Sequence, residues 1–274
     1  MKVINQLKSL KEELSFQNNQ SIGYVPTMGA LHQGHLSLVK LAKKKSQFVV
    51  ASIFVNPTQF NNKNDLKKYP RSLENDLDLL NSESVDLVFC PSYNELYANE
   101  KIVKVDLMGL DKTLEGSNRK GHFEGVIRVL NIFFSLIKPD FAFFGEKDYQ
   151  QYLIVEQFAK IFFPKLKIVS CPTLRESNGL AMSSRNRHLN NREKELASEI
   201  YKTLLYCRNN YNKIEINKLE EICFQKLSKF SKPEYFEIRN SKNLSKELSS
   251  SSSLRAFVAT KLSEIRLIDN IAMN

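Results

Sequence analysis

The residues best suited to chemistry begin with two histidines in a glycine-containing segment. Residues 26–35 read Pro-Thr-Met-Gly-Ala-Leu-His-Gln-Gly-His, so that Gly29 and Gly34 flank His32, and His35 ends the segment. Glycine lets a backbone approach a ligand closely, and a helix that starts here offers unpaired N–H groups to an anion. Two imidazoles add donors that stabilise charge on a phosphate or on a pentavalent phosphorus transition state. The segment therefore predicts phosphate chemistry.

Two other interpretations of the histidine pair compete with phosphate binding. A turn can hold two histidines without any function, and a metal-dependent hydrolase could use them as ligands. The hydrolase needs a third ligand, and no nearby residue is a convincing one. The position of the pair directly after an expected strand favours phosphate binding over both.

Three further segments carry groups suited to a small acid and a polyphosphate. Asn56 and Gln59 each donate and accept hydrogen bonds, as binding a hydroxy acid requires, although Asn-Pro is also common in turns. Lys147, in Gly-Glu-Lys-Asp, suits a phosphate; its alternative is an exposed ion pair worth about 0–1 kcal/mol. Two serines precede Arg185, a phosphate-binding composition that also occurs in solvated linkers.

The elements that must position these segments alternate between strand and helix. Strands are expected at 22–25, 47–55, 85–90, 141–144 and 166–171, with helices around 36–42, 73–80, 126–137 and 149–161. This alternation predicts a mostly parallel sheet covered on both faces. Each polar segment follows a strand, and ligands of open parallel sheets bind beyond the carboxyl ends of the strands. We therefore expect the four segments to meet over one crevice and to catalyse phosphoryl or nucleotidyl transfer.

The pattern changes after about residue 176. Residues 192–230 are polar and helical in pattern, and short strands are expected at 235–239 and 256–260. The sequence thus predicts an α/β fold: a Rossmann-like parallel-sheet domain that binds nucleotide over residues 1–176, and a smaller α+β domain over residues 177–274.

Composition excludes several classes of protein. The 274 residues are 42% hydrophobic and 26% charged, with a net charge of +10 and no tryptophan. Basic residues are scattered rather than clustered, which disfavours a nucleic-acid-binding protein, the alternative from a different class. No stretch is long and apolar enough for a membrane span, and the N-terminus lacks signal-peptide features. We expect a cytoplasmic protein without a membrane or nucleic-acid partner, whose four unclustered cysteines are structural thiols.

Six stretches of the sequence, in order, match one family. They are 26–35, 52–60, 69–71, 145–151, 179–186 and 266–270. On these stretches the chain resembles the pantoate–β-alanine ligase family, within a wider superfamily of nucleotidyltransferases with a Rossmann-like domain. The resemblance implies an ATP- and Mg²⁺-dependent reaction in which pantoate forms pantoyl adenylate and pyrophosphate, and β-alanine then gives pantothenate and AMP. It also implies a homodimer. The alternative is a related nucleotidyltransferase that acts on a different small acid.

The resemblance further implies which residues serve the reaction. His35, assisted by His32, would stabilise charge on the transferring phosphate, with Lys147 and Arg185 on the phosphates. Gln59 and Gln151 would hold pantoate, with Asn56 beside them, and Asp76 is either a magnesium-side carboxylate or a first-turn helix acid. The expected ATP-binding residues are Met28, Gly29, Ala30, Leu31, His32, Gln33, Gly34, His35, Gly145, Glu146, Lys147, Asp148, Leu174, Met182, Ser183, Ser184 and Arg185.

The chain departs from the family pattern in two places. Where relatives commonly have Thr-Val-Val-x-Lys, residues 128–132 read Arg-Val-Leu-Asn-Ile, with the cation four positions earlier. One turn of helix could exchange one cation for the other on the pantoate side. Residues 260–265 replace the usual small residues and glycine, a difference that concerns the second domain, which acts largely as a lid in the family.

Overall fold

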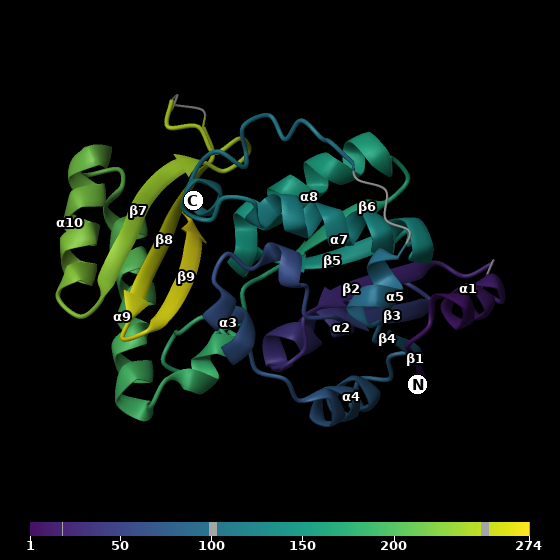
Figure 1. Cartoon of the computed structure of the whole chain (residues 1–274). Helices are drawn as coiled ribbons and strands as arrows, with labels where there is room; N and C mark the ends of the chain where they lie inside the picture. Colours follow the sequence, from purple (N-terminus) through teal and green to yellow (C-terminus); the bar gives the residue numbers. More distant parts are fainter. Residues whose placement is uncertain (18, 99–102, 248–251, 274) are drawn as a thin grey trace. The chain divides into compact units, whose positions relative to one another are not determined.

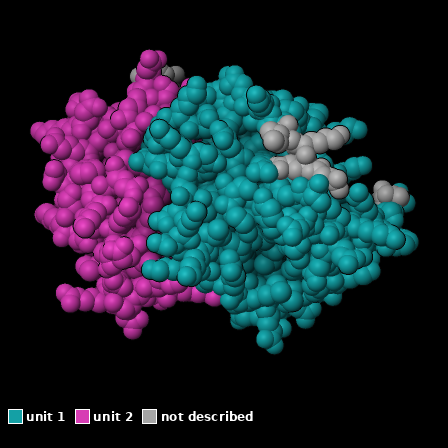
Figure 2. Space-filling model, viewed as in Figure 1, with its two compact units in different colours: residues 1–146, 154–172 teal, residues 147–153, 173–274 magenta. Residues whose placement is uncertain are grey.

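The chain folds into two compact units in a computed structural model that describes residues 1–17, 19–98, 103–247 and 252–273 (Figure 1). Unit 1 comprises residues 1–146 and 154–172, and unit 2 comprises residues 147–153 and 173–274, as coloured in Figure 2. The division runs through one helix, α8. The sequence divides the chain differently, into domains 1–176 and 177–274, and this division stays a prediction.

Unit 1 is built on a six-stranded sheet. Its strands are β1 (Lys2–Ile4), β2 (Ile22–Thr27), β3 (Phe48–Ile53), β4 (Leu87–Phe89), β5 (Phe141–Gly145) and β6 (Lys167–Cys171). They lie in the order β1-β4-β3-β2-β5-β6, and every neighbouring pair is parallel. The predicted α/β fold with a parallel sheet is confirmed. The sequence pattern missed β1, which is only three residues long and has two exposed residues.

Helices and short turns connect these strands. They are α1 (Leu7–Ser15), α2 (Gln33–Lys45), η1 (Pro57–Gln59), α3 (Lys63–Lys68), α4 (Leu73–Ser82), α5 (Tyr93–Tyr97), α6 (Glu115–Asn118), α7 (His122–Ile137), η2 (Glu146–Asp148) and α8 (Tyr149–Phe162). Alternate residues of β2 face opposite sides of the sheet. Val25 packs in a cluster with Val39 of α2 and Leu80 of α4, whereas the ring of Tyr24 contacts Phe133 and Phe134 of α7.

The strand order fixes where the polar segments of unit 1 lie. β2 is hydrogen-bonded to β3 on one side and to β5 on the other, so the order of the strands reverses there. Because the strands are parallel, their carboxyl ends share one edge of the sheet. The segments that follow Thr27, Ile53 and Gly145 therefore begin at that edge, next to the reversal point where open α/β sheets bind ligands.

Unit 2 is a small α+β fold. Its antiparallel sheet contains β7 (Lys232–Asn240), β8 (Leu254–Leu262) and β9 (Ile265–Ala272) in that order, with η3 (Ser184–His188), α9 (Asn191–Asn210) and α10 (Ile216–Ser228). Leu204 and Cys207 of α9, Cys223 of α10 and Val258 of β8 are fully or almost fully buried in one core cluster. The sequence pattern missed β9, because its polar residues interrupt the apolar alternation.

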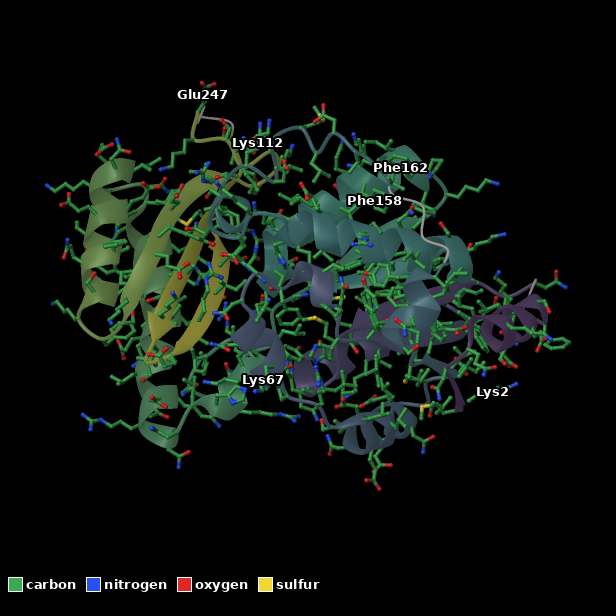
Figure 3. The ribbon with its side chains drawn as sticks, viewed as in Figure 1. Lys2, Lys67, Lys112, Phe158, Phe162 and Glu247 are labelled. Carbon is green, nitrogen blue, oxygen red and sulfur yellow. The ribbon has the colours of Figure 1, made fainter. Side chains whose placement is uncertain are left out.

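The surface carries the excess of basic residues. Lys2, Lys67 and Lys112 are exposed, and their side chains project from the ribbon in Figure 3. Within the ranges that the structure describes, no helix has both the length and the hydropathy needed to cross a bilayer.

Candidate active site

The histidine segment forms a tight loop between β2 and α2. Gly29 and Ala30 have φ angles of 78° and 50°, a left-handed conformation that is common for glycine and uncommon for alanine. His32 then caps the N-terminus of α2, and His35 lies in the first turn. Met28 to Leu31 thus form the loop itself, whereas Gln33, Gly34 and His35 form the first turn of α2, where the Gly34 N–H donates to His32 Nδ1 and the His35 N–H donates to the His32 carbonyl.

The Nδ1 atom of each histidine accepts a hydrogen bond from a backbone N–H of this segment. His32 Nδ1 accepts from the Gly34 N–H at 3.1 Å, His35 Nδ1 accepts from the His32 N–H at 3.3 Å, and the ring centroids are 4.1 Å apart. An Nδ1 that accepts carries no proton, so the neutral ring of each histidine carries its proton on Nε2. Both side chains are therefore arranged to donate from Nε2, which suits stabilisation of negative charge.

Asp76 holds the histidine loop from beneath. Its carboxylate is 1% exposed and accepts from the N–H groups of Ala30 and Leu31, both at 2.7 Å, and from Ser72 Oγ at 3.2 Å. Asp76 lies in the first turn of α4, as one of the two sequence interpretations held. Neither interpretation foresaw the loop contacts, because the residues are far apart in the sequence. With its oxygens directed at backbone N–H groups, this carboxylate fits a loop anchor better than a ligand of magnesium.

Asn56 and Gln59 follow β3 in the turn η1. Asn56 is 1% exposed, and its Nδ2 donates to Gln59 Oε1 and to the Gly125 carbonyl, each at 3.0 Å. Its Oδ1 accepts from Thr58 and, at 2.8 Å, from Tyr97 Oη. Asn56 is thus engaged by the protein on both sides of its amide. With its Oε1 held by Asn56, Gln59 donates from Nε2 to the sulfur of Met28 at 3.2 Å.

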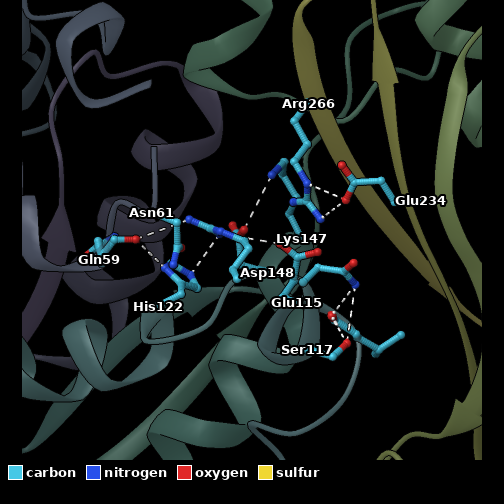
Figure 4. A network of polar contacts seen from close by, with 12 residues as sticks. Gln59, Asn61, Glu115, Ser117, His122, Lys147, Asp148, Glu234 and Arg266 are labelled. Atoms are coloured by element: carbon cyan, nitrogen blue, oxygen red, sulfur yellow. Dashed lines mark hydrogen bonds and ion pairs between the residues drawn. The ribbon is translucent and has the colours of Figure 1, made fainter. Parts of the chain in front are cut away.

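Helix α7 supports this turn closely. The backbone of η1 lies so near Gly125 that a Cβ there would be 2.5 Å from the Thr58 oxygen, which only glycine permits. His122 Nδ1 donates to the Gln59 carbonyl at 2.8 Å, as Figure 4 shows. The other ring nitrogen of His122 lies 3.0 Å from Arg119 Nη1. His122 of α7 therefore holds the main chain of Gln59, and Asn56 holds its side chain.

Arg128, the cation that departs from the family pattern, stacks above a ring of this network. Its guanidinium carbon lies 4.8 Å from the centroid of Tyr97, whose hydroxyl donates to Asn56. Arg128 therefore contacts Tyr97, one of the residues that support η1.

The remaining predicted residues of unit 1 lie at the end of β5. Gly145 ends the strand, and Glu146 begins η2 and accepts from Ser170 Oγ of β6 at 3.3 Å. Lys147, Asp148 and Gln151 belong to unit 2. The amine of Lys147 lies 3.6 Å from Asp148, with 18% of its side chain exposed, and Gln151 lies in the first turn of α8.

Other predicted residues of unit 2 form a short hairpin and the turn that follows it. The Met182 N–H donates to the Leu174 carbonyl at 3.0 Å, which pairs two residues expected to bind nucleotide. Ser183 then caps η3 by accepting from the Arg185 N–H at 3.3 Å, and Ser184 is buried. Leu174 through Arg185 thus form one continuous structure rather than two separate contributions.

The whole chain matches one family model. Residues 1–272 match the model for pantoate-beta-alanine ligase. The chain belongs to this family. A pantothenate synthetase of Christiangramia forsetii is 45% identical over 267 residues, which cover 94% of this chain and 93% of that protein. One from Azobacteroides pseudotrichonymphae is 42% identical over 260 residues, which cover 93% of each.

Solved structures of the family match over the full chain as well. The pantothenate synthetase of Thermus thermophilus is 36% identical with a TM-score of 0.91, covering 100% of this chain and 99% of that one. The pantoate-beta-alanine ligase of Francisella tularensis, complexed with β-γ ATP and β-alanine, is 36% identical with a TM-score of 0.84, covering 100% and 98%.

Several residues that contact the predicted segments, in one unit or the other, had no assigned role from the sequence. His122, Tyr97 and Gly125 support η1, and Asp269 and Asn270 contact the segments of unit 2. A signal existed for some of them: Gly121-His-Phe-Glu-Gly125 is a polar, glycine-flanked start to an apolar helix, and Asp269-Asn270 lies in a stretch shared with the family. Their partners could not be identified without the fold.

Proposed function

We propose that this chain condenses pantoate with β-alanine to form pantothenate, at the expense of ATP. A pantoate carboxylate oxygen attacks the α-phosphorus, the bond to the β-phosphate bridging oxygen breaks, and pyrophosphate leaves. The amine of β-alanine then attacks the acyl carbon of pantoyl adenylate, and AMP leaves as the amide forms. The observation that carries the proposal is the histidine loop, with two imidazoles held by backbone N–H groups at a helix N-terminus beyond a parallel strand, in a chain of this family.

We assign charge stabilisation in the first step to the two histidines. Their Nδ1 atoms are engaged with the backbone, so each neutral ring offers an Nε2 donor to the phosphate oxygens as negative charge builds up. His35 acts in the family's catalytic position, and His32 assists. Lys147 and Arg185 contribute cations on the phosphates, and the remaining ATP contacts are those expected from the sequence.

Pantoate, in this proposal, contacts Gln59 directly and Asn56 only indirectly. The Asn56 amide is engaged by protein groups and holds Gln59 Oε1, so we assign the contact with pantoate to Gln59 Nε2, which donates to Met28 Sδ in this structure. Gln151 serves as the second pantoate contact. Asp76 acts as the anchor of the histidine loop.

The decisive experiment is an assay with defined substrates. Purified protein supplied with ATP, Mg²⁺, pantoate and β-alanine is expected to release AMP and pyrophosphate in equal amounts and to form pantothenate. With β-alanine omitted, pantoate alone should support exchange of labelled pyrophosphate into ATP. If exchange requires a different carboxylic acid, the chain is a nucleotidyltransferase with another substrate, and the pantoate assignment is wrong.

Three further features complete the proposal. Mg²⁺ enters with ATP as its complex, so chelation by EDTA should abolish AMP release; among the described residues no group of three His, Cys, Asp or Glu side chains is arranged to hold a metal ion. The chain forms a homodimer, which light scattering after size-exclusion chromatography tests. It acts in the cytoplasm, where its cysteines, which form no disulfide, stay reduced.

A further inference from the structure

Two neighbouring polar residues of β9, Asp269 and Asn270, are buried. They are 5% and 4% exposed, and the reaction scheme gives neither a role. Adjacent residues of a strand project to opposite faces of the sheet. Asp269 shares its face with Leu267 and Ile271, which belong to the core packed by α9, whereas Asn270 lies on the other face. One strand can therefore hold two different segments of unit 2.

Asp269 holds the hairpin that precedes Arg185. Its carboxylate accepts from both terminal nitrogens of Arg175, at 2.6 and 3.0 Å, in the paired geometry that makes such contacts strong. The guanidinium lies 3.7 Å from the ring centroid of Tyr201 on α9 and donates to the Gly179 carbonyl at 3.2 Å. Arg175 is thus fixed by charge, by stacking and by the turn of its own hairpin.

The position of Arg175 transmits this hold to the expected nucleotide contacts. It directly follows Leu174, whose carbonyl accepts from the Met182 N–H, and the next pair, Glu176 with Leu180, closes the hairpin. The residues that follow the turn of this hairpin continue directly into η3, which contains Arg185. A shift of Arg175 would therefore shift the start of η3.

Asn270 holds the segment of Lys147. Its Nδ2 donates to the Lys147 carbonyl at 2.9 Å, and its Oδ1 accepts from Arg255 of β8. The Arg255 guanidinium in turn lies 3.7 Å from the ring centroid of Tyr149, two residues after Lys147. The backbone of η2 and the first turn of α8 are thus fixed by one amide and one stacked cation.

We propose that Asp269 and Asn270 are positioning residues that hold the Lys147 and Arg185 segments in a fixed arrangement for one triphosphate. This inference rests on the proposed function of Lys147 and Arg185 as phosphate contacts. It gives a purpose to a polar pair in the middle of a strand, where burial without partners would be costly. Both positioning residues lie on one strand, β9.

The sharpest test is Asn270→Asp, which keeps the shape and the acceptor for Arg255 but removes the donor to the Lys147 carbonyl. We expect the rate of pyrophosphate exchange to fall about tenfold and the KM for ATP to rise, with the KM for β-alanine within twofold. Amides of residues 147–151 should exchange hydrogen for deuterium faster. Asn240→Asp on β7 makes the same chemical change outside this network and should leave both readouts unchanged.

A second variant, at the partner of Asp269, distinguishes the paired geometry of the contact between Arg175 and Asp269 from its charge. Arg175→Lys keeps the positive charge but loses the paired contact and the stacked plane. We expect faster exchange of amides in residues 174–182 and a raised KM for ATP, with residues 147–151 unaffected. Unaltered exchange in either segment, or an unaltered KM for ATP in a folded variant, overturns the positioning role of the corresponding residue.

Failure of this inference is distinguishable from failure of the proposed function. If the unaltered protein releases no AMP from ATP when it is supplied with pantoate and β-alanine, the substrate assignment is wrong. Binding of a non-hydrolysable ATP analogue still reports on Lys147 and Arg185, because this binding does not require the carboxylic acid substrate. Asn270→Asp should then weaken that binding about tenfold, and an affinity equal to that of Asn240→Asp contradicts the inference.

Discussion

His35 is the residue on which the proposed chemistry depends most. Its Nδ1 accepts from the His32 N–H, so the neutral ring carries its proton on Nε2, which is the donor that the proposal assigns to the phosphate. His35→Ala should lower turnover by about 10²-fold or more, because a donor to a developing charge is removed from the transition state. Single-turnover measurement of pyrophosphate release tests this expectation. An unchanged rate would remove His35 from the mechanism.

Asp76 is a buried carboxylate whose hydrogen bonds hold the backbone of the histidine loop. Asp76→Asn keeps one acceptor but turns an NH₂ group toward the Ala30 or Leu31 N–H, so that one backbone donor loses its partner. We expect a loss of about 1–3 kcal/mol in the free energy of unfolding and a higher KM for ATP. Initial rates against ATP concentration and urea unfolding measure the two effects.

The Asp76 substitution also separates anchoring from metal binding. If Asp76 bound magnesium, Asp76→Asn would raise the Mg²⁺ concentration needed for half-maximal rate, whereas a loop anchor leaves that concentration unchanged. Asp78→Asn, at an exposed position of the same helix, is the matched control. A shifted Mg²⁺ requirement in Asp76→Asn alone would contradict the anchoring role.

The packing of η1 on α7 requires a residue without a side chain at position 125, where the sequence has glycine. In Gly125→Ala the new Cβ would lie 2.5 Å from the Thr58 oxygen and 2.7 Å from the Gln59 nitrogen, so the turn must move. We expect a destabilisation of about 1–3 kcal/mol and a raised KM for pantoate, with the KM for ATP little changed. Steady-state kinetics in both substrates checks this. Glu124→Ala, exposed on the same helix, should alter neither constant.

The long elements were the most predictable from the sequence. α7 and β3 were foreseen because their apolar residues recur with the period of a buried helix or strand over many residues. β1 is too short to show a period, and β9 carries buried polar residues that look like loop residues in the sequence. The missed elements are those whose burial is decided by distant partners.

For the whole molecule, the net charge of +10 divides into two parts. Lysines such as Lys2, Lys67 and Lys112 are exposed and spread over the surface, which favours solubility rather than a partner (Figure 3). We propose a role with substrate only for a few cations: Lys147 and Arg185 on a triphosphate, and Arg128 on the pantoate side. Filter binding with RNA should show no tight, salt-sensitive complex.

Stability at alkaline pH should report on two thiols of unit 1, the half-buried Cys90 and the buried Cys171. Burial, reinforced by the charge of Asp76, raises the pKa of Cys90 to about 11, and burial with Glu146 raises that of Cys171 to about 12. Above pH ~9 the unfolded chain releases protons that the folded protein retains, so stability falls as pH rises through these values. Urea unfolding between pH 8 and 11 measures the loss. The double variant Cys90→Ala, Cys171→Ala should lose less stability over that range than the unaltered protein; an equal loss contradicts the assignment.

The sequence determined the alternation of strands and helices, the histidine loop and the polar segments that follow the strands, because these features depend on neighbours within a few residues. It could not determine what holds them. Asp76 lies 46 residues from Ala30, and Asn270 lies 123 residues from the backbone oxygen of Lys147 that it binds. A polar side chain looks the same in a sequence whether it faces water or a buried N–H group. Only the folded chain brings such partners within hydrogen-bonding distance, and so only the fold distinguishes residues that contact substrate from residues that position them.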